Sequence, residues 1–413
     1  MNTKDIQGFF HEDFSGVAHL LQKQVGGEGR GGAAVCVYHH GEKVVDIWAG
    51  ERSHDHSPWE SDTMAVSFST TKGVLSTALH ILVDRGLCNY SDRVSKHWPE
   101  FGCIGKEAIT IEQVLSHRTG LYAVSPLIDH IEQFLDWDYM CTQLANSTPR
   151  IKPGTRPGYQ ALTFGWLAGE LIRRISGKPV EQFVQDAIAK PLDLDGLYLL
   201  TPPSEKKRVA DLITSHSPKS GPKKAMKAET RNEKRLRRWL PNTMVHALIP
   251  PGIKSLIFAS QLLDAPIPAF NGVFTARSLA KMYGALACGG ELEGQRLLSQ
   301  KTLQRATKIQ TRRRDKVLLI PMCWSLGYHI APTSRGVPRR AFGHFGYGGS
   351  GAWADPQREL AVAMTLNRIA GSPVGDRRMV SLGGAALKAA KRHQRSLRKP
   401  TQGSTEVLSS HKG

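Results

Sequence analysis

The chain has 413 residues, of which 40% are hydrophobic and 22% are charged, as is typical of a folded globular protein with about two domains. No run approaches the roughly 18 apolar residues that a membrane-spanning helix needs. The first residues lack the basic start and apolar stretch of a signal peptide, and the six cysteines contain no Cys-x-x-Cys pair. We therefore expect a cytoplasmic protein with single thiols and no disulfide framework.

The net charge of +19 is unevenly distributed along the chain. Residues 206–238 contain twelve Lys and Arg against three acidic residues, and residues 388–399 contain six without any acidic residue. Such runs can bind nucleic acid or an anionic surface, but no aromatic RNA-binding motif accompanies them. We expect no specific nucleic-acid partner. Two interpretations of the basic insert 206–238 stay open: a solvated loop, and a mobile flap that makes weak contact with anionic substrates or surfaces.

The predicted elements run from strands to helices and back to strands. Residues 33–49 form two β-rich runs joined by a turn at 40–42, and a helix starting at Ser69 ends near Gly86. Further helices are expected at 111–117, 129–145, 162–176, 179–190, 275–289, 300–308 and 377–394, and β-rich segments at 323–330, 342–354 and 360–367. The segment after residue 400 has the composition of a disordered tail.

Strands at both ends of the chain and helices between them predict an α/β protein of the α+β type. We expect an antiparallel sheet that is built from both chain ends and flanked by helices. Residues 15–85 and 275–395 would form this sheet domain. Residues 86–274 would form a mainly helical domain that contains the basic insert 206–238, and residues 396–413 a disordered tail.

The segment Ser69-Thr-Thr-Lys72 opens a long helical pattern of apolar residues. A serine and a lysine three residues apart on a helix share one face, with Cβ atoms roughly 5–6 Å apart. The lysine amine could then take the proton of the serine hydroxyl, and the helix N-terminus favours developing negative charge. The pattern alone is weak, because Ser-x-x-Lys recurs at Ser204, Ser220, Ser278, Ser396 and Ser409.

Three further segments accompany Ser69 in a fixed order. They are the helix and break at 109–121, a turn and helix at 153–177 that contains Tyr159, and a glycine-rich segment at 343–356. Together these segments resemble the serine β-lactamase and penicillin-binding-protein superfamily over about residues 15–390. Within it, they are most similar to the β-lactamase-like carboxylesterases of family VIII.

The resemblance implies a role for each matched position. Ser69 would be the acylated nucleophile, Lys72 its base, and Tyr159 the group that relays protons to the leaving group and from water. The oxyanion hole would consist of the backbone N–H groups of Ser69 and Tyr347, with Gly346 and Gly348 on either side of Tyr347. Because lysine and tyrosine have reference pKa values of about 10.4 and 10, we expect the site to lower both.

Two departures from the β-lactamase pattern bear on the substrate. Ala161 stands where a β-lactamase usually has an asparagine that contacts the substrate amide, and His344 stands in the position of a lysine. Without that lysine, no fixed charge holds a β-lactam carboxylate, so a small neutral ester is the expected substrate. We therefore assign His344, Gly346, Gly348 and Ala161 to the substrate site.

Other functions remain as alternatives. The same fold would suit a β-lactamase, a D-amino peptidase or an acyltransferase, and a catalytically silent scaffold could bind an anionic partner. Taken alone, a tyrosine such as Tyr159 is more often a packing residue than a catalytic one. For His344, the sequence favours neither a structural nor a catalytic role. No Gly-x-Ser-x-Gly elbow, phosphate loop or dinucleotide fingerprint is present. The pair His54 and His56 lacks further ligands at metal-site spacing, so neither a metal nor a cofactor is expected.

Overall fold

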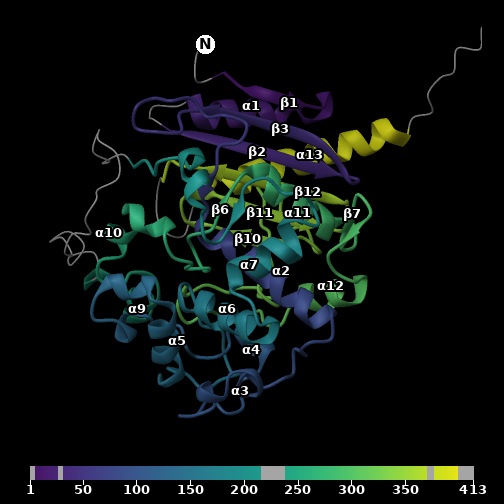
Figure 1. Ribbon diagram of the computed structural model, residues 1–413. Coiled ribbons are helices and arrows are strands. Elements are labelled where there is room, and N and C mark those ends of the chain that lie inside the picture. Colours follow the sequence, from purple (N-terminus) through teal and green to yellow (C-terminus); the bar gives the residue numbers. More distant parts are fainter. Residues whose placement is uncertain (1–4, 27–30, 215–237, 370–375, 399–413) are drawn as a thin grey trace, which may run out of the picture.

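The computed structural model describes residues 5–26, 31–214, 238–369 and 376–398. Within them, a seven-stranded antiparallel sheet has the order β1-β3-β2-β12-β11-β10-β9 (Figure 1). The strands are β1 (Gln7–Phe10), β2 (Gly32–His39), β3 (Glu42–Gly50), β9 (His329–Ile330), β10 (Phe342–Phe345), β11 (Gly351–Asp355) and β12 (Leu360–Leu366). The two chain ends meet where β12 pairs with β2, so the predicted α+β fold is confirmed.

The central strands are buried on both faces, and alternate side chains serve two separate cores. On β2, Val35 and Val37 belong to the core under helices α1 (Ser15–Gly26) and α13 (Arg378–Arg398). Cys36 and Tyr38 between them point to the larger core on the opposite face. Burial on both sides explains why β2 and β12 read as nearly continuous apolar runs in the sequence.

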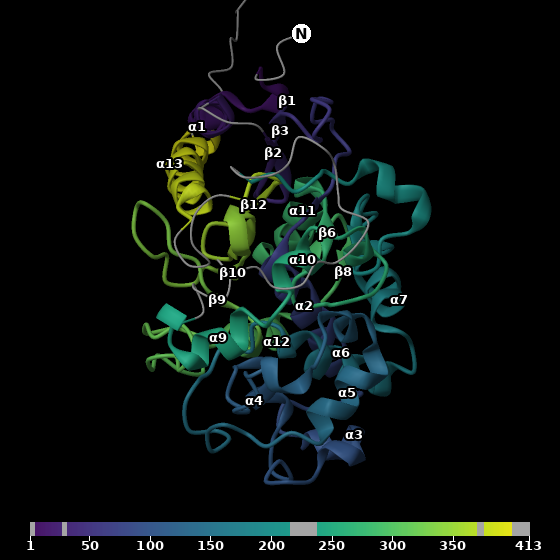
Figure 2. The same ribbon diagram turned by 90° about the vertical axis from the view of Figure 1, so that its left-hand side faces the viewer.

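Helices α2 (Thr71–Asp84) and α11 (Ala276–Ala287) cover the second face of the sheet. Further helices contribute to the larger core, and among them α6 (Thr163–Ser176) contacts α2 directly (Figure 2). The others are α3 (Val94–His97), α4 (Ile111–Leu115), α5 (Trp137–Ala145), α7 (Val180–Val184), α9 (Asn242–Leu248), α10 (Ile253–Ile257) and α12 (Gln300–Thr307). Short strands complete the fold: β4 (Ala65–Val66), β5 (Leu197–Tyr198) and β6 (Val273–Phe274) form one small sheet, and β7 (Glu291–Leu292) and β8 (Gln295–Arg296) a hairpin.

Several predicted boundaries are wrong. The helix expected at 129–145 is a 3-10 turn followed by α5, because the Asp136 side chain accepts the Tyr139 N–H and starts a new helix. In the β-rich segment 323–330, only His329–Ile330 is a strand of the sheet. The chain turns at Gly327 (φ +81°), where a Cβ would lie 1.9 Å from Ser76 Oγ. The tail after residue 400 and most of the basic insert lie outside the described residues.

No helix in the described part of the chain is both long enough and apolar enough to cross a membrane.

The core holds several buried polar side chains, histidines among them. Burial lowers the pKa of His39 and of His80 from 6.5 to about 3. His80 is neutral in the fold, and its ring nitrogens lie 2.9 Å from Leu326 O and from Tyr90 OH.

These two histidines should make the fold sensitive to acid. Below about pH 6.5 these histidines bind protons in the unfolded chain but not in the folded chain. The stabilisation that this difference provides is therefore fully present above about pH 6.5 and is lost as the pH falls towards 3. Each histidine should remove about 1.4 kcal/mol of unfolding free energy per pH unit in this range. Urea unfolding at a series of pH values should show a shallower dependence of unfolding free energy on pH for His80→Gln than for the wild type. A flat profile for the wild type would contradict the prediction.

Candidate active site

Ser69 lies in a 3-10 turn, Phe68–Thr70, that leads from strand β4 into helix α2. Phe68 has a positive φ of 47°, a conformation that costs a bulky residue about 1–3 kcal/mol. Its ring packs against the rings of Phe270 and Tyr347, which hold the turn in place. Ser69 is partly exposed, so solvent molecules can reach its hydroxyl.

The three residues expected to act together meet at Ser69 Oγ. Lys72 Nζ lies 2.9 Å from Ser69 Oγ, and the Tyr159 hydroxyl lies 2.8 Å from the same oxygen. Lys72 reaches it from the first turn of α2, whereas Tyr159 comes from a loop that precedes α6. A hydroxyl between an amine and a phenol is well placed to lose its proton to the one and to receive a proton from the other.

Lys72 is fully buried, and burial holds the pKa of its amine well below the ordinary value. Its Nζ donates to Ala161 O and to Ala269 O, both at 2.7 Å. A neutral amine has two N–H donors and one lone pair, so the two carbonyls leave the lone pair facing Ser69 Oγ. This arrangement suits a base that takes the Ser69 proton.

Tyr159 differs from the expectation. Burial raises the pKa of its hydroxyl instead of lowering it, although the hydrogen bond to Ser69 acts in the opposite direction. Lys72 lies over the ring, with Nζ 5.2 Å from the ring centre, but burial disfavours the charged amine that would stabilise a phenolate. Tyr159 is therefore a protonated phenol in the resting site, and it donates to Ser69.

A buried carboxylate that the sequence analysis missed fixes the position of Tyr159. Asp315 accepts the Tyr159 N–H at 3.0 Å and the indole N–H of Trp324 at 3.1 Å. The Trp324 ring stacks on the Tyr159 ring, with centroids 5.3 Å apart and planes 12° from parallel. His117 packs edge-on against both rings. In the sequence, Asp315 follows three arginines and looks like part of a solvated charged run.

The glycine-rich segment after β10 lies directly against the serine turn. Ser350 Oγ donates to Ser67 O at 2.9 Å, and Gly346 N–H donates to Ser350 O at 2.8 Å. A Cβ on Gly346 would lie 2.3 Å from Ser67 O, so only glycine permits this approach. The segment thereby brings the loop of Tyr347 beside the turn that carries Ser69.

The remaining predicted site residues lie around this centre in different roles. His344 is buried, its ring lies 6.3 Å from that of Tyr159, and burial holds its pKa well below the ordinary value. Ala161 contributes its carbonyl oxygen to Lys72. Gly348 has a positive φ of 81° in a tight turn, and its carbonyl accepts an N–H from Arg378.

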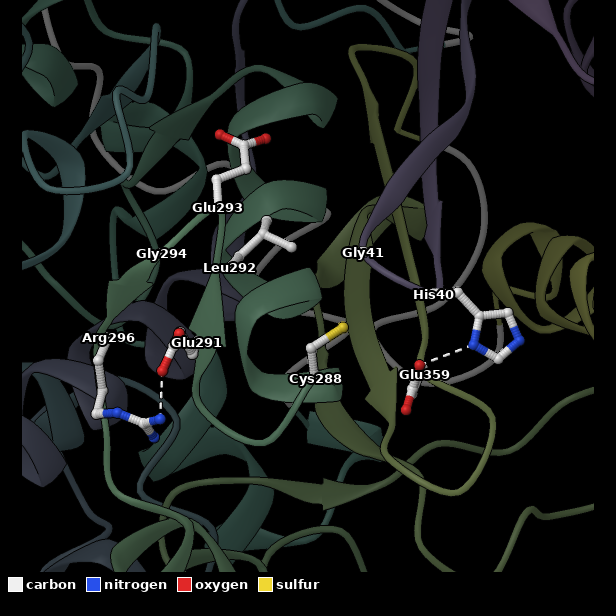
Figure 3. A pocket seen from close by; sticks show the side chains of 9 residues that line it. All are labelled: His40, Gly41, Cys288, Glu291, Leu292, Glu293, Gly294, Arg296 and Glu359. Carbon is white, nitrogen blue, oxygen red and sulfur yellow. Dashed lines mark hydrogen bonds and ion pairs between the residues drawn. The ribbon is translucent and has the colours of Figure 1, made fainter.

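A shallow surface hollow of about 500 Å³ lies elsewhere, between the β7–β8 hairpin and the β2–β3 turn (Figure 3). Its polar side chains contact one another: His40 Nδ1 lies 2.7 Å from Glu359 Oε2, and Arg296 pairs with Glu291. Cys288 lines the hollow, and burial raises the pKa of its thiol, so it is a poor nucleophile. This hollow therefore lacks the chemistry found at Ser69.

The histidine pair that hinted at a metal lies on the surface. His56 Nδ1 is 2.9 Å from Glu51 Oε1, and the His56 side chain is largely exposed. Within residues 5–26, 31–214, 238–369 and 376–398, no three His, Cys, Asp or Glu side chains converge as a metal site would require.

The sequence matches a family model described as Beta-lactamase over residues 17–382. It is 38% identical over 361 residues to the esterase/beta-lactamase LipL of Mycobacterium tuberculosis, covering 86% of this chain and 81% of LipL. Esterase EstB of Burkholderia gladioli is 27% identical over 180 residues, which cover 40% of this chain and 45% of EstB.

Solved structures show the same architecture. A family VIII carboxylesterase superimposes with a TM-score of 0.82 at 32% identity, covering 93% of this chain and 100% of the other. A penicillin-binding protein homologue from Caulobacter crescentus superimposes with a TM-score of 0.81 at 33% identity and the same coverage.

Proposed function

The chain belongs to the beta-lactamase family of serine hydrolases, and on that premise we propose that it cleaves carboxylic esters through an acyl-enzyme on Ser69. One observation supports this most directly: Ser69 Oγ lies within hydrogen-bond distance of both a buried amine and a buried phenol. The esterase names of LipL and EstB and the family VIII carboxylesterase support an ester substrate.

In the acylation step, Lys72 takes the proton of Ser69 as Oγ attacks the ester carbonyl carbon. The Oγ–C bond forms, and the bond between that carbon and the alcohol oxygen breaks. Tyr159 gives its proton to the departing alcohol and regains one from the Lys72 ammonium. Burial of Lys72 favours this return, because a charged amine is costly in that environment.

Deacylation runs the same proton path in reverse order. A water molecule takes the place of the alcohol and loses its proton through Tyr159 to Lys72 as it attacks the acyl carbon. Ser69 leaves with a proton from Lys72, which restores the neutral amine. The oxyanion of both steps would be held by the backbone N–H groups of Ser69 and Tyr347. The close contact of their two segments through Ser350 supports this assignment.

Tyr159→Phe should lower kcat/KM for an activated ester by roughly 10²- to 10⁴-fold, the usual worth of a positioned acid–base group. Thermal stability should change little, because the hydroxyl bonds only to Ser69 among the described residues. Tyr328→Phe is the matched control, since it removes a buried hydroxyl that bonds to Thr77. Equal activity in both variants would make Tyr159 a packing residue.

The proposed substrate class can be tested with nitrocefin beside p-nitrophenyl butyrate. His344 is buried, and burial favours its neutral form, so it supplies no charge for a β-lactam carboxylate. The butyrate ester should therefore have the larger kcat/KM by about 10²-fold or more, since a missing charge-assisted contact costs about 2–3 kcal/mol. Comparable values for the two substrates would favour a β-lactamase over an esterase.

The basic insert 206–238 enters the proposal through its described start. Ile213 N–H donates to Asn367 O, and Ile369 N–H donates to Ile213 O. Ile369 in turn lies against Gly348, where a Cβ would be 3.4 Å away. This position beside the glycine-rich segment supports a role for the insert at the site entrance, in contact with anionic groups.

The scattered cysteines, all free thiols, support a cytoplasmic location.

A further inference from the structure

Two neighbouring loops beside Tyr159 carry exposed cations. One loop is 150–156 and the other is 310–316. The Arg313 guanidinium donates to Thr155 O and Lys316 N–H donates to Pro157 O, both at 2.9 Å, so the loops lie together. Their exposed cations, here called the two-loop cationic surface, are Arg150, Lys152, Arg156, Arg312, Arg313 and Arg314.

The carboxylates next to this surface form no ion pair with it. Asp315 is fully buried, and its oxygens are occupied by N–H groups of Tyr159 and of three other residues. Glu112 is engaged by Arg118 and Arg305. Within the part of the chain that the structure describes, none of the six cations forms an ion pair with a carboxylate.

The surface is close enough to Ser69 to act on a substrate. Arg156 lies three residues before Tyr159, which is at most about 11 Å of chain. The Tyr159 hydroxyl is 2.8 Å from Ser69 Oγ. Exposed charges act over a Debye length of about 30 Å at 0.01 M salt and about 8 Å at 0.15 M salt. At low salt the field of these loops therefore reaches the nucleophile.

We propose that the ester substrate itself carries an anionic group, such as a carboxylate, sulfate or phosphate, which the two-loop cationic surface draws towards Ser69. The inference rests on the proposed esterase function and assigns to it an anionic ester in place of the neutral ester expected from the sequence. Guanidinium groups without a carboxylate partner suit such oxyanions, because their forked N–H donors match the geometry of two oxygens. A surface of one sign beside a site also raises the rate of encounter with ligands of the opposite sign.

A pair of esters that differ in one substituent of the leaving group, a carboxylate in one and a neutral carboxamide in the other, tests the inference. In 4-(butyryloxy)benzoate and 4-(butyryloxy)benzamide the acyl group is the same, and only the former has a negative leaving group. The wild-type kcat/KM should favour the benzoate by about tenfold at about 0.01 M salt, and this preference should fall steeply towards about 0.3 M. Equal salt slopes for the two esters would overturn the inference. Hydrolysis of the benzamide shows independently whether the proposed function holds.

Charge reversal separates a local effect from the overall net charge. The triple variant Lys152→Glu, Arg156→Glu, Arg312→Glu should abolish or invert the preference while the benzamide is still hydrolysed. The matched control Lys388→Glu, Lys391→Glu, Arg395→Glu makes the same change of charge on exposed residues of α13, which packs with α1 on the other face of the sheet. A control that shifts the preference as much as the triple variant would overturn the inference. A deletion of residues 217–230 would also overturn the inference if it removed the preference for the benzoate while the triple variant retained that preference.

Discussion

Ser69→Ala is expected to abolish hydrolysis of p-nitrophenyl butyrate, with a loss of about 10⁴- to 10⁶-fold in kcat. Ser69 Oγ is the atom on which Lys72 Nζ and the Tyr159 hydroxyl converge, at 2.9 Å and 2.8 Å. Removal of this oxygen leaves the amine and the phenol in place but no atom to form the acyl bond. The fold should persist, because the Ser69 side chain is partly exposed.

Ser278→Ala is the matched control for this variant. Ser278 also begins a Ser-x-x-Lys pair and is buried, but its hydroxyl donates to Gly196 O, and Lys281 pairs with Glu293. Its loss should lower stability by about 1 kcal/mol and leave kcat unchanged. If Ser69→Ala kept wild-type turnover, or if Ser278→Ala were the inactive variant, the nucleophile would be wrongly assigned.

Lys72→Met should lower kcat by about 10³- to 10⁴-fold, because it removes the only amine beside Ser69 in the described residues and replaces it with a side chain of similar length. It also leaves Ala161 O and Ala269 O without their donor, which should cost about 1–3 kcal/mol of unfolding free energy. In the wild type, protonation of Lys72 should lower kcat as the pH falls. A profile of kcat against pH for Lys72→Met should lack this decline.

Lys106→Met separates the loss of a base from the loss of a buried lysine. Lys106 is also buried, and its Nζ donates to Ser147 O at 2.8 Å. Both variants should be destabilised to a similar extent by urea unfolding, but only Lys72→Met should lose catalysis. Equal kcat values in the two variants would show that Lys72 is a structural lysine.

The fold could be predicted where local patterns and global packing agree. The apolar run of β12 is visible in the sequence because a strand that is buried on both faces needs apolar side chains. The end of α6 is visible because its C-cap, Gly177, adopts a left-handed conformation (φ 70°) that favours glycine. Strand β1 was not predicted, since three of its four residues are exposed and its place depends on pairing with β3. The 3-10 turn before α5 likewise depends on the capping of the next helix by Asp136.

The candidate site was predictable only for the residues to which we assign the reaction. Ser69, Lys72 and Tyr159 lie in motifs, and the structure brings them within hydrogen-bond distance. The direction of the Tyr159 pKa could not be predicted, because it follows from burial against Trp324 and other rings. Asp315 was missed for the same reason: its buried contacts join segments that are more than 150 residues apart in the chain.

Covalent labelling of the nucleophile tests the central claim, that Ser69 is the residue that is acylated, most directly. A fluorophosphonate should add one phosphonyl group to the wild-type protein, with loss of fluoride, and peptide mass spectrometry should place the group on Ser69. The adduct should be absent from Ser69→Ala and should form at the wild-type rate in Ser278→Ala. An adduct on another residue, or labelling of Ser69→Ala at the wild-type rate, would contradict the account.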